Sequence, residues 1–167
     1  MIIIKNTNNT RNWIVWHRDV TGHLLLNDQR AVQSLEGIYN VTDKSFDLLD
    51  WTDVSNVGQE YVAYVFAHDD SDESMIKCGS YTGNGSTDGP EIDLGFEPQW
   101  VMIKSATGNH GWIMHDTMRG WTADGNPIAR LRADQSGAEY NDANYTECAV
   151  TSTGFRMTDT HASTNGS

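Results

Sequence analysis

The amino-acid sequence predicts an all-β protein, and three observations lead to this prediction. Apolar residues occur in short runs that are separated by clusters of Gly, Asn, Ser, Thr and Asp, which favour turns. Six Trp and six Tyr are many for 167 residues, and aromatic side chains pack well on pleated sheets. No stretch has a convincing helical period, and residues 129–138 are the least poor candidate. Because hairpin-length turns separate the runs, we expect an antiparallel β-sandwich or jelly-roll-like fold.

The first strand candidates, residues 2–5 and 13–18, flank an Asn- and Thr-rich turn and predict a hairpin. Residues 61–67 are apolar on both faces, which predicts a central strand that is covered on both sides. The remaining strand candidates are residues 23–27, 74–81, 92–96, 100–104, 111–115 and 154–157. The predicted core consists of Ile3, Trp13, Tyr61, Ala63, Val65, Phe96, Val101, Ile103, Trp112 and Phe155.

An internal repeat predicts how the chain is organised. Residues 2–5 match residues 101–104 at an offset of 99, and Trp13-Ile14 matches Trp112-Ile113 at the same offset. Farther on, the offset grows to 106 and then 108, for the matched pairs Asp28-Gln29 with Asp134-Gln135 and residues 55–58 with 163–166. An offset that grows in loops is typical of a duplicated fold with insertions.

The repeat predicts a degenerate tandem array, with an incomplete first β-sandwich repeat in residues 1–75 and a second repeat in residues 76–167. The second repeat lacks a counterpart of residues 61–67, its last strand. We expect the two copies to complete each other within one globular unit, or a longer array or a neighbouring chain to supply the missing strand.

Charge excludes some partners. Lys and Arg number 11 against 23 Asp and Glu, a formal net charge of −12, which disfavours nucleic acid and anionic membrane surfaces. No apolar run is long enough for a spanning helix. Cys78 and Cys148 do not make a disulfide framework and are expected to be small buried or half-buried thiols, although one bridge stays open.

Four segments carry a resemblance to a known family: SYTGNGSTDGP at 80–90, GFEPQWVMIK at 95–104, GWIMHD at 111–116 and YVAYVFA at 61–67. They resemble an uncharacterised repeat of tail-fibre-like and other structural proteins of tailed bacteriophages, especially marine ones. The resemblance implies a β-sandwich module that serves as a building block or adhesion module on the virion surface, without assigned catalytic residues. The chain departs from the family in the missing last strand and in the acidic run at residues 68–73.

Several side-chain groups are candidate sites. The carboxylates Asp69, Asp70, Asp72 and Glu73 could bind a metal such as Ca²⁺, but their spacing lacks the calcium-loop pattern and a solvated loop is the competing interpretation. The Gly-rich residues 81–89 precede a strand, not a helix, which favours a structural turn over a phosphate loop. Trp51 and Trp121 lie in loop-like contexts, where an exposed indole could stack on a sugar ring.

The resemblance implies a non-catalytic structural component of a phage virion, as a fibre, tail appendage or capsid decoration. Its expected partners are other virion proteins and further copies of itself, with no cofactor. The alternative is a carbohydrate-binding host-adhesion module that contacts a host surface glycan. A polysaccharide depolymerase is a third alternative, because some of the 23 acidic residues could form a catalytic carboxylate pair.

Overall fold

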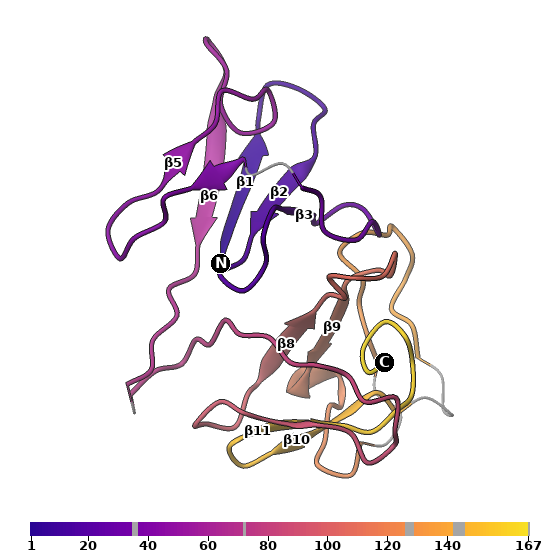
Figure 1. The fold of residues 1–167 in the computed structure, drawn as a ribbon. Helices are drawn as coiled ribbons and strands as arrows, with labels where there is room; N and C mark the ends of the chain where they lie inside the picture. The colour runs from indigo at the N-terminus through magenta and orange to yellow at the C-terminus, as the bar shows by residue number, and fades with distance from the viewer. Residues whose placement is uncertain (35–36, 72, 126–128, 142–145, 167) are drawn as a thin grey trace. The chain divides into compact units, whose positions relative to one another are not determined.

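The computed structural model describes residues 1–34, 37–71, 73–125, 129–141 and 146–166 (Figure 1). The chain divides into two compact units, Met1–Gly79 and Ser80–Ser167. Within the described ranges, all regular elements are strands apart from one short 3-10 turn, and every sheet is antiparallel. The all-β, sandwich-like class that the sequence predicts is confirmed.

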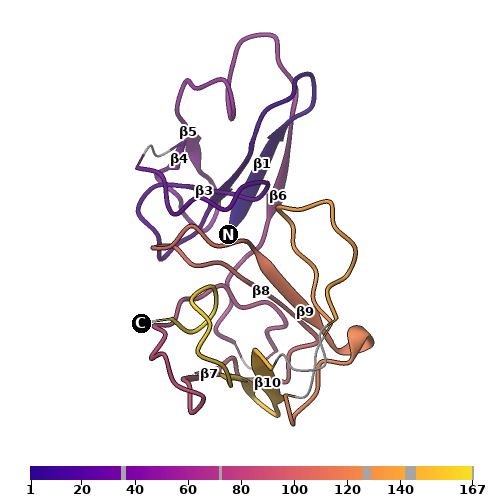
Figure 2. The same cartoon turned by 90° about the vertical axis from the view of Figure 1, so that its right-hand side faces the viewer.

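Unit 1 is built around a four-stranded sheet in the order β3-β2-β1-β6 (Figures 1 and 2). Its strands are β1 (Ile2–Asn6), β2 (Trp13–Trp16), β3 (Leu24–Leu25) and β6 (Tyr61–Val65). A separate pair is formed by β4 (Ile38–Tyr39) and β5 (Asp47–Leu48). One hydrophobic cluster of unit 1 lies on one face of the large sheet and contains Ile2, Ile4, Ile14, Leu25, Ile38 and Val54.

The described part of unit 2 forms two smaller sheets. The first has the order β10-β11-β7, from β10 (Cys148–Thr151), β11 (Gly154–Met157) and β7 (Glu91–Asp93). The second is the hairpin of β8 (Trp100–Ile103) and β9 (Ile113–Asp116), which the 3-10 turn η1 (Thr117–Arg119) follows. The buried core of unit 2 contains Ile103, Trp121, Cys148, Val150, Phe155 and Met157.

The two units share the geometry of one hairpin. Ile2 pairs with Trp16 and Ile4 with Ile14 in unit 1, while Val101 pairs with His115 and Ile103 with Ile113 in unit 2, a constant offset of 99. The next contacts agree at an offset of 107, because the bridge between His23 and Gln33 corresponds to that between Arg130 and Tyr140. Duplication of the sequence stays a prediction, whereas the register of the two hairpins is the same.

A side-chain anchor is also shared by the two hairpins. In unit 1 the backbone N–H of Trp13 donates to Asn27 Oδ1 at 2.8 Å, and in unit 2 that of Trp112 donates to Asp134 Oδ1 at 2.8 Å. The sequence match pairs Asp28 with Asp134 at an offset of 106, whereas the anchor pairs Asn27 with Asp134. The sequence match is therefore one residue out at this point, because the anchor needs only a side-chain oxygen and both Asn and Asp supply one.

The prediction of a central strand at residues 61–67 is wrong. β6 lies at the edge of its sheet, and Val62, Tyr64 and Val65 are 42%, 48% and 62% exposed. Ala63 is exposed as well. Apolar side chains on both faces do not by themselves place a strand at the centre of a sheet. In the described part of the chain, β6 pairs with β1 on one side and with no strand on the other.

The other core predictions fared unevenly. Ile3, Ile103, Trp112 and Phe155 are buried, whereas Trp13, Tyr61, Phe96 and Val101 are half-buried. Ala63 and Val65 are exposed for the reason just given. The predicted strand at residues 74–81 is absent, because Ser74 Oγ bonds locally to Ile76 and the Cys78 N–H donates to His68 Nδ1.

Candidate functional site

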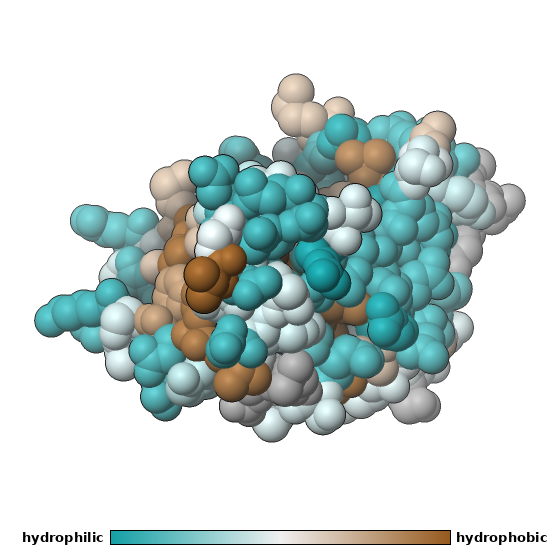
Figure 3. Space-filling model, turned by 90° about the horizontal axis from the view of Figure 1, so that it is seen from above, coloured by the Kyte–Doolittle hydropathy of each residue, from teal (hydrophilic) through white to brown (hydrophobic). Residues whose placement is uncertain are grey.

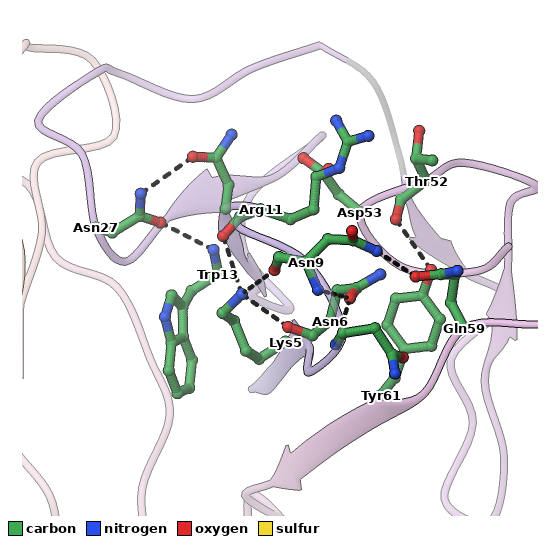
Figure 4. Close-up of polar contacts among 12 residues, drawn as sticks. Lys5, Asn6, Asn9, Arg11, Trp13, Asn27, Thr52, Asp53, Gln59 and Tyr61 are labelled. Atoms are coloured by element: carbon green, nitrogen blue, oxygen red, sulfur yellow. Dashed lines mark hydrogen bonds and ion pairs between the residues drawn. The ribbon is translucent and has the colours of Figure 1, made fainter.

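A hollow of about 700 Å³ opens on the β1–β2 hairpin of unit 1. Figure 4 shows the hairpin loop and its polar contacts, and Figure 3 shows hydrophobic side chains exposed among hydrophilic ones on the face seen from above. The lining comes from three segments: the β1–β2 hairpin with its loop, Asn27, and β6. The lining residues are Lys5, Asn6, Thr7, Asn8, Asn9, Thr10, Arg11, Trp13, Asn27, Val62 and Tyr64.

Lys5 fixes the hairpin loop by hydrogen bonds to its backbone. Its Nζ donates to the carbonyl oxygens of Asn6, Asn9 and Arg11 at 2.7, 3.3 and 3.1 Å (Figure 4). The buried Asn6 adds an Asx turn, since its Oδ1 accepts the N–H groups of Asn8 and Asn9 at 2.9 Å. These internal hydrogen bonds fix the backbone of the loop, which carries the Asn and Thr side chains of the lining.

Two aromatic rings form the apolar part of the hollow. Trp13 lies directly opposite Lys5 across the β1–β2 ladder, and Tyr64 lies opposite Ile3 on the other side of β1. Because opposed residues share a face, the two rings stand on the same side of the sheet, with centroids 6.2 Å apart and planes at 25°. Tyr64 is 48% exposed, so a flat ligand can reach its ring.

The polar wall combines amides with one cation. Asn27 is anchored, because its Oδ1 accepts from Trp13 and its Nδ2 donates to Asn12 Oδ1 at 3.0 Å. Arg11 lies 3.9 Å from Asp53 Oδ1, and 46% of its side chain is exposed. Among the described residues, no carboxylate belongs to the lining, so these residues supply neither the acid nor the nucleophile of a two-carboxylate glycosidase mechanism. Exposed aromatic faces beside amide donors and acceptors suit the apolar face and hydroxyls of a sugar.

A second, smaller hollow of about 400 Å³ lies elsewhere on unit 1. Its lining consists of Trp16, Ile38, Tyr39, Asn40, Val41 and Leu49.

The two predicted Trp contacts have different fates. Trp51 is half-buried against the unit 1 core, with its ring centroid 5.0 Å from that of His23, and its contact with a ligand stays a prediction. The exposure expected for Trp121 is wrong, because this side chain is 2% exposed. Its Nε1 donates to the carbonyl of Cys148 at 3.1 Å and its ring packs on Phe155, so a sugar cannot stack on it.

In the acidic run, the carboxylates of Asp69 and Asp70 bond to neighbouring side chains. Asp69 accepts the N–H and Oγ–H of Ser71, and Asp70 pairs with Lys77 and His68. These bonds hold the pKa values of both carboxyls below the usual range, through Ser71 for Asp69 and chiefly through Lys77 for Asp70. Glu73 is exposed, and Asp72 lies outside the described residues. Within the described ranges, no three of the His, Cys, Asp and Glu side chains come together.

A buried charged cluster in unit 2 was not found from the sequence. Arg130 pairs with Glu147 Oε1, and His115 Nε2 lies 2.9 Å from Glu147 Oε2. The side chains of Arg130, Glu147 and His115 are 6%, 1% and 0% exposed. Burial lowers the pKa of His115 to about 4, so the ring is neutral near pH 7. Because all three side chains are buried, a solute cannot reach the cluster, and we interpret it as a structural feature of unit 2.

Each unit contains one cysteine, Cys78 in unit 1 and Cys148 in unit 2. Cys78 and Cys148 are buried and free, in agreement with the prediction of small buried thiols. Burial raises the pKa of the Cys148 thiol, which keeps it protonated and unreactive.

The fold and the hollow define the class of protein: an all-β, two-unit protein with a hairpin-borne surface hollow and a carboxylate-free lining. A family model of a domain of unknown function, DUF7483, matches residues 1–167, and the chain belongs to this family. No curated protein and no solved structure matches the chain. None of the described helical segments has the length and hydropathy needed to cross a membrane.

Proposed function

We propose that the protein is a non-catalytic structural component of a tailed-phage particle, as part of a fibre, a tail appendage or a capsid decoration. The observation that carries the proposal is the hairpin shared by the two units, with one register and one side-chain anchor. A protein that repeats a stable module can form an extended surface, because each module packs in the same way as the one before it. The assignment to a virion comes from the resemblance of residues 61–67, 80–90, 95–104 and 111–116 to phage structural repeats.

Immunogold electron microscopy of purified particles tests this proposal. Label on fibres, tail or capsid of intact particles is the expected result, and its position would identify the particle part. Particles that carry no label, although the same antibody detects the protein in the infected-cell lysate, would overturn the proposal.

A second candidate function is host adhesion through a carbohydrate, and the hollow of Trp13 and Tyr64 favours it. The rings offer an apolar platform, and the amides of the loop offer donors and acceptors in fixed positions. The ligand class is a neutral or acidic surface glycan, since Arg11 supplies a partly exposed positive charge.

Glycan-array binding followed by calorimetry tests the adhesion candidate. Tyr64→Ala should weaken binding about fivefold, because an aromatic contact contributes on the order of 1 kcal/mol. Tyr39→Ala is the matched control, since Tyr39 is exposed but lies outside this hollow. Equal loss in both variants, or binding that neither variant changes, would remove the hollow from consideration.

A further inference from the structure

We propose that the open edge of β6 pairs with β6 of a second copy of this chain. The pairing is antiparallel and two-fold symmetric about Ala63, and it joins two four-stranded sheets into one continuous sheet. This inference deepens the proposed structural role and rests on it for its biological meaning, but its test needs only the purified protein. The argument comes from the backbone of β6, its side chains and its charge.

The backbone of β6 leaves one row of hydrogen-bonding groups pointing away from its neighbour. Met1 and Phe66 exchange bonds of 3.0 and 2.9 Å, and the Thr7 N–H donates to Glu60 O at 2.9 Å. Because bonded and non-bonded pairs alternate in an antiparallel ladder, Val62 and Tyr64 also bond inward to β1. The N–H and C=O groups of Tyr61, Ala63 and Val65 therefore point outward, where the described residues provide no partner strand.

The side chains of β6 lack the features that protect edges. Natural edge strands carry charged residues, proline or bulges that prevent pairing with other chains. β6 has the sequence YVAYV, without charge or proline, and its register with β1 runs without a bulge from Tyr61 to Val65. Three apolar side chains on this strand are exposed, at 42% for Val62, 48% for Tyr64 and 62% for Val65. Such an edge is complete only when another strand covers it.

The sequence of β6 matches itself in the antiparallel sense, and this identifies the occupant as a second copy. With Ala63 opposite Ala63 of the second copy, Val62 faces Tyr64 and Tyr61 faces Val65 of that copy. Aromatic and β-branched residues in directly opposed positions stabilise sheets, and the small Ala63 lets the backbones approach at the centre.

Charge is compatible with the same register. The protein carries −12 overall, so contact between two copies needs a surface without like charges. In this register Glu60 faces Phe66 of the second copy, and no two carboxylates oppose each other along the strand. The symmetric arrangement therefore joins the copies along an uncharged strip.

Sedimentation equilibrium of the full chain, with two edge variants, tests the proposal. Ala63→Pro removes only an outward N–H, so the bonds to β1 remain, and Val65→Lys places a charge on the strip. Wild type should dimerise, and Ala63→Pro should bind itself roughly thirtyfold more weakly, because two symmetric hydrogen bonds are lost. Val57→Lys is the matched control, since Val57 is 96% exposed outside β6. Circular dichroism checks that all variants stay folded.

A cysteine cross-link gives an independent positive result. Opposed residues of a bonded antiparallel pair have Cα atoms about 5.5 Å apart, within the range that a disulfide spans. Ala63→Cys should form a covalent dimer on mild oxidation, whereas Val57→Cys should not. Both native cysteines are buried, which keeps the background low. A monomeric wild type at all concentrations, or a dimer that both edge variants leave unchanged and Ala63→Cys fails to trap, would overturn the proposal and leave the virion assignment untouched.

Discussion

Replacement of Arg130 by methionine should destabilise unit 2 strongly. The guanidinium is buried and pairs with Glu147, which is 1% exposed. Among the described residues, the remaining neighbour of Glu147 within ion-pair distance is then His115, whose ring is neutral near pH 7 because burial lowers its pKa to about 4. A buried carboxylate without a positive partner costs about 3–5 kcal/mol, a large part of the stability of an ordinary domain.

Urea unfolding at pH 7, followed by tryptophan fluorescence and near-ultraviolet circular dichroism, measures this loss. Trp121 is a useful reporter, since its ring centroid lies 6.3 Å from that of His115. Arg119→Met is the matched control: this arginine pairs with Asp116 and Glu139 at the surface and should contribute about 1 kcal/mol or less. The double variant Arg130→Met/Glu147→Leu should recover much of the loss, because it removes both charges. If Arg130→Met costs no more than Arg119→Met, the interpretation of the cluster is wrong.

Three further predictions follow from the same structure. Between pH 6.5 and 4 the unfolded chain binds a proton at His115 that the folded chain does not bind, because burial lowers the pKa of His115 to about 4. Acidification over this range should therefore lower the free energy of unfolding by about 3 kcal/mol through this group. Asp159 has the opposite effect, because burial raises its pKa to about 6 and the folded chain binds the proton first. The difference in urea midpoint between wild type and His115→Gln at pH 7 and pH 4.5 isolates the histidine, and a difference that does not change with pH would contradict this. Asn27→Ala should cost about 1 kcal/mol in thermal unfolding, because the anchor to the Trp13 N–H is lost. Asn27→Asp should cost less, since it keeps the anchor that Asp134 makes in unit 2 and loses only the exposed bond to Asn12 Oδ1; equal losses would refute the equivalence. Gly22→Ala should cost more than about 1 kcal/mol, because Gly22 has a φ of +107° and a Cβ would collide with the Gln33 carbonyl, while Gly79→Ala, with open space around it, should change the unfolding midpoint little.

The local parts of the fold could be predicted from the sequence. The hairpin of β1 and β2 follows from two apolar runs around an Asn-rich turn, and the chain places both strands within two residues of their predicted bounds. The strand β6 was also predicted, but its place in the sheet was not. Apolar residues on both faces are compatible with a covered centre and with an edge, and only the long-range pairing of β6 with β1 decides between them.

The candidate site illustrates why contacts between distant segments escape a sequence reading. Trp13 was assigned to the core and Tyr64 was not singled out, although the two rings meet across β1. Trp121 follows a short 3-10 turn, and the sequence around it predicts a loop. Its burial depends on Cys148 and Phe155, which follow much later in the chain. The cluster of His115, Arg130 and Glu147 likewise joins three separate segments, and no local pattern relates them.

The common hairpin register has an evolutionary consequence. Trp16 and His115 occupy the same register position, yet Trp16 borders the smaller surface hollow while His115 lies in the closed charged cluster. The same hairpin geometry thus accepts a half-buried indole in one unit and a buried imidazole in the other. A point mutation at this register position can therefore alter the surface of unit 1 while the packing of unit 2 is kept, so that adaptation of a surface and retention of a core are separate genetic events.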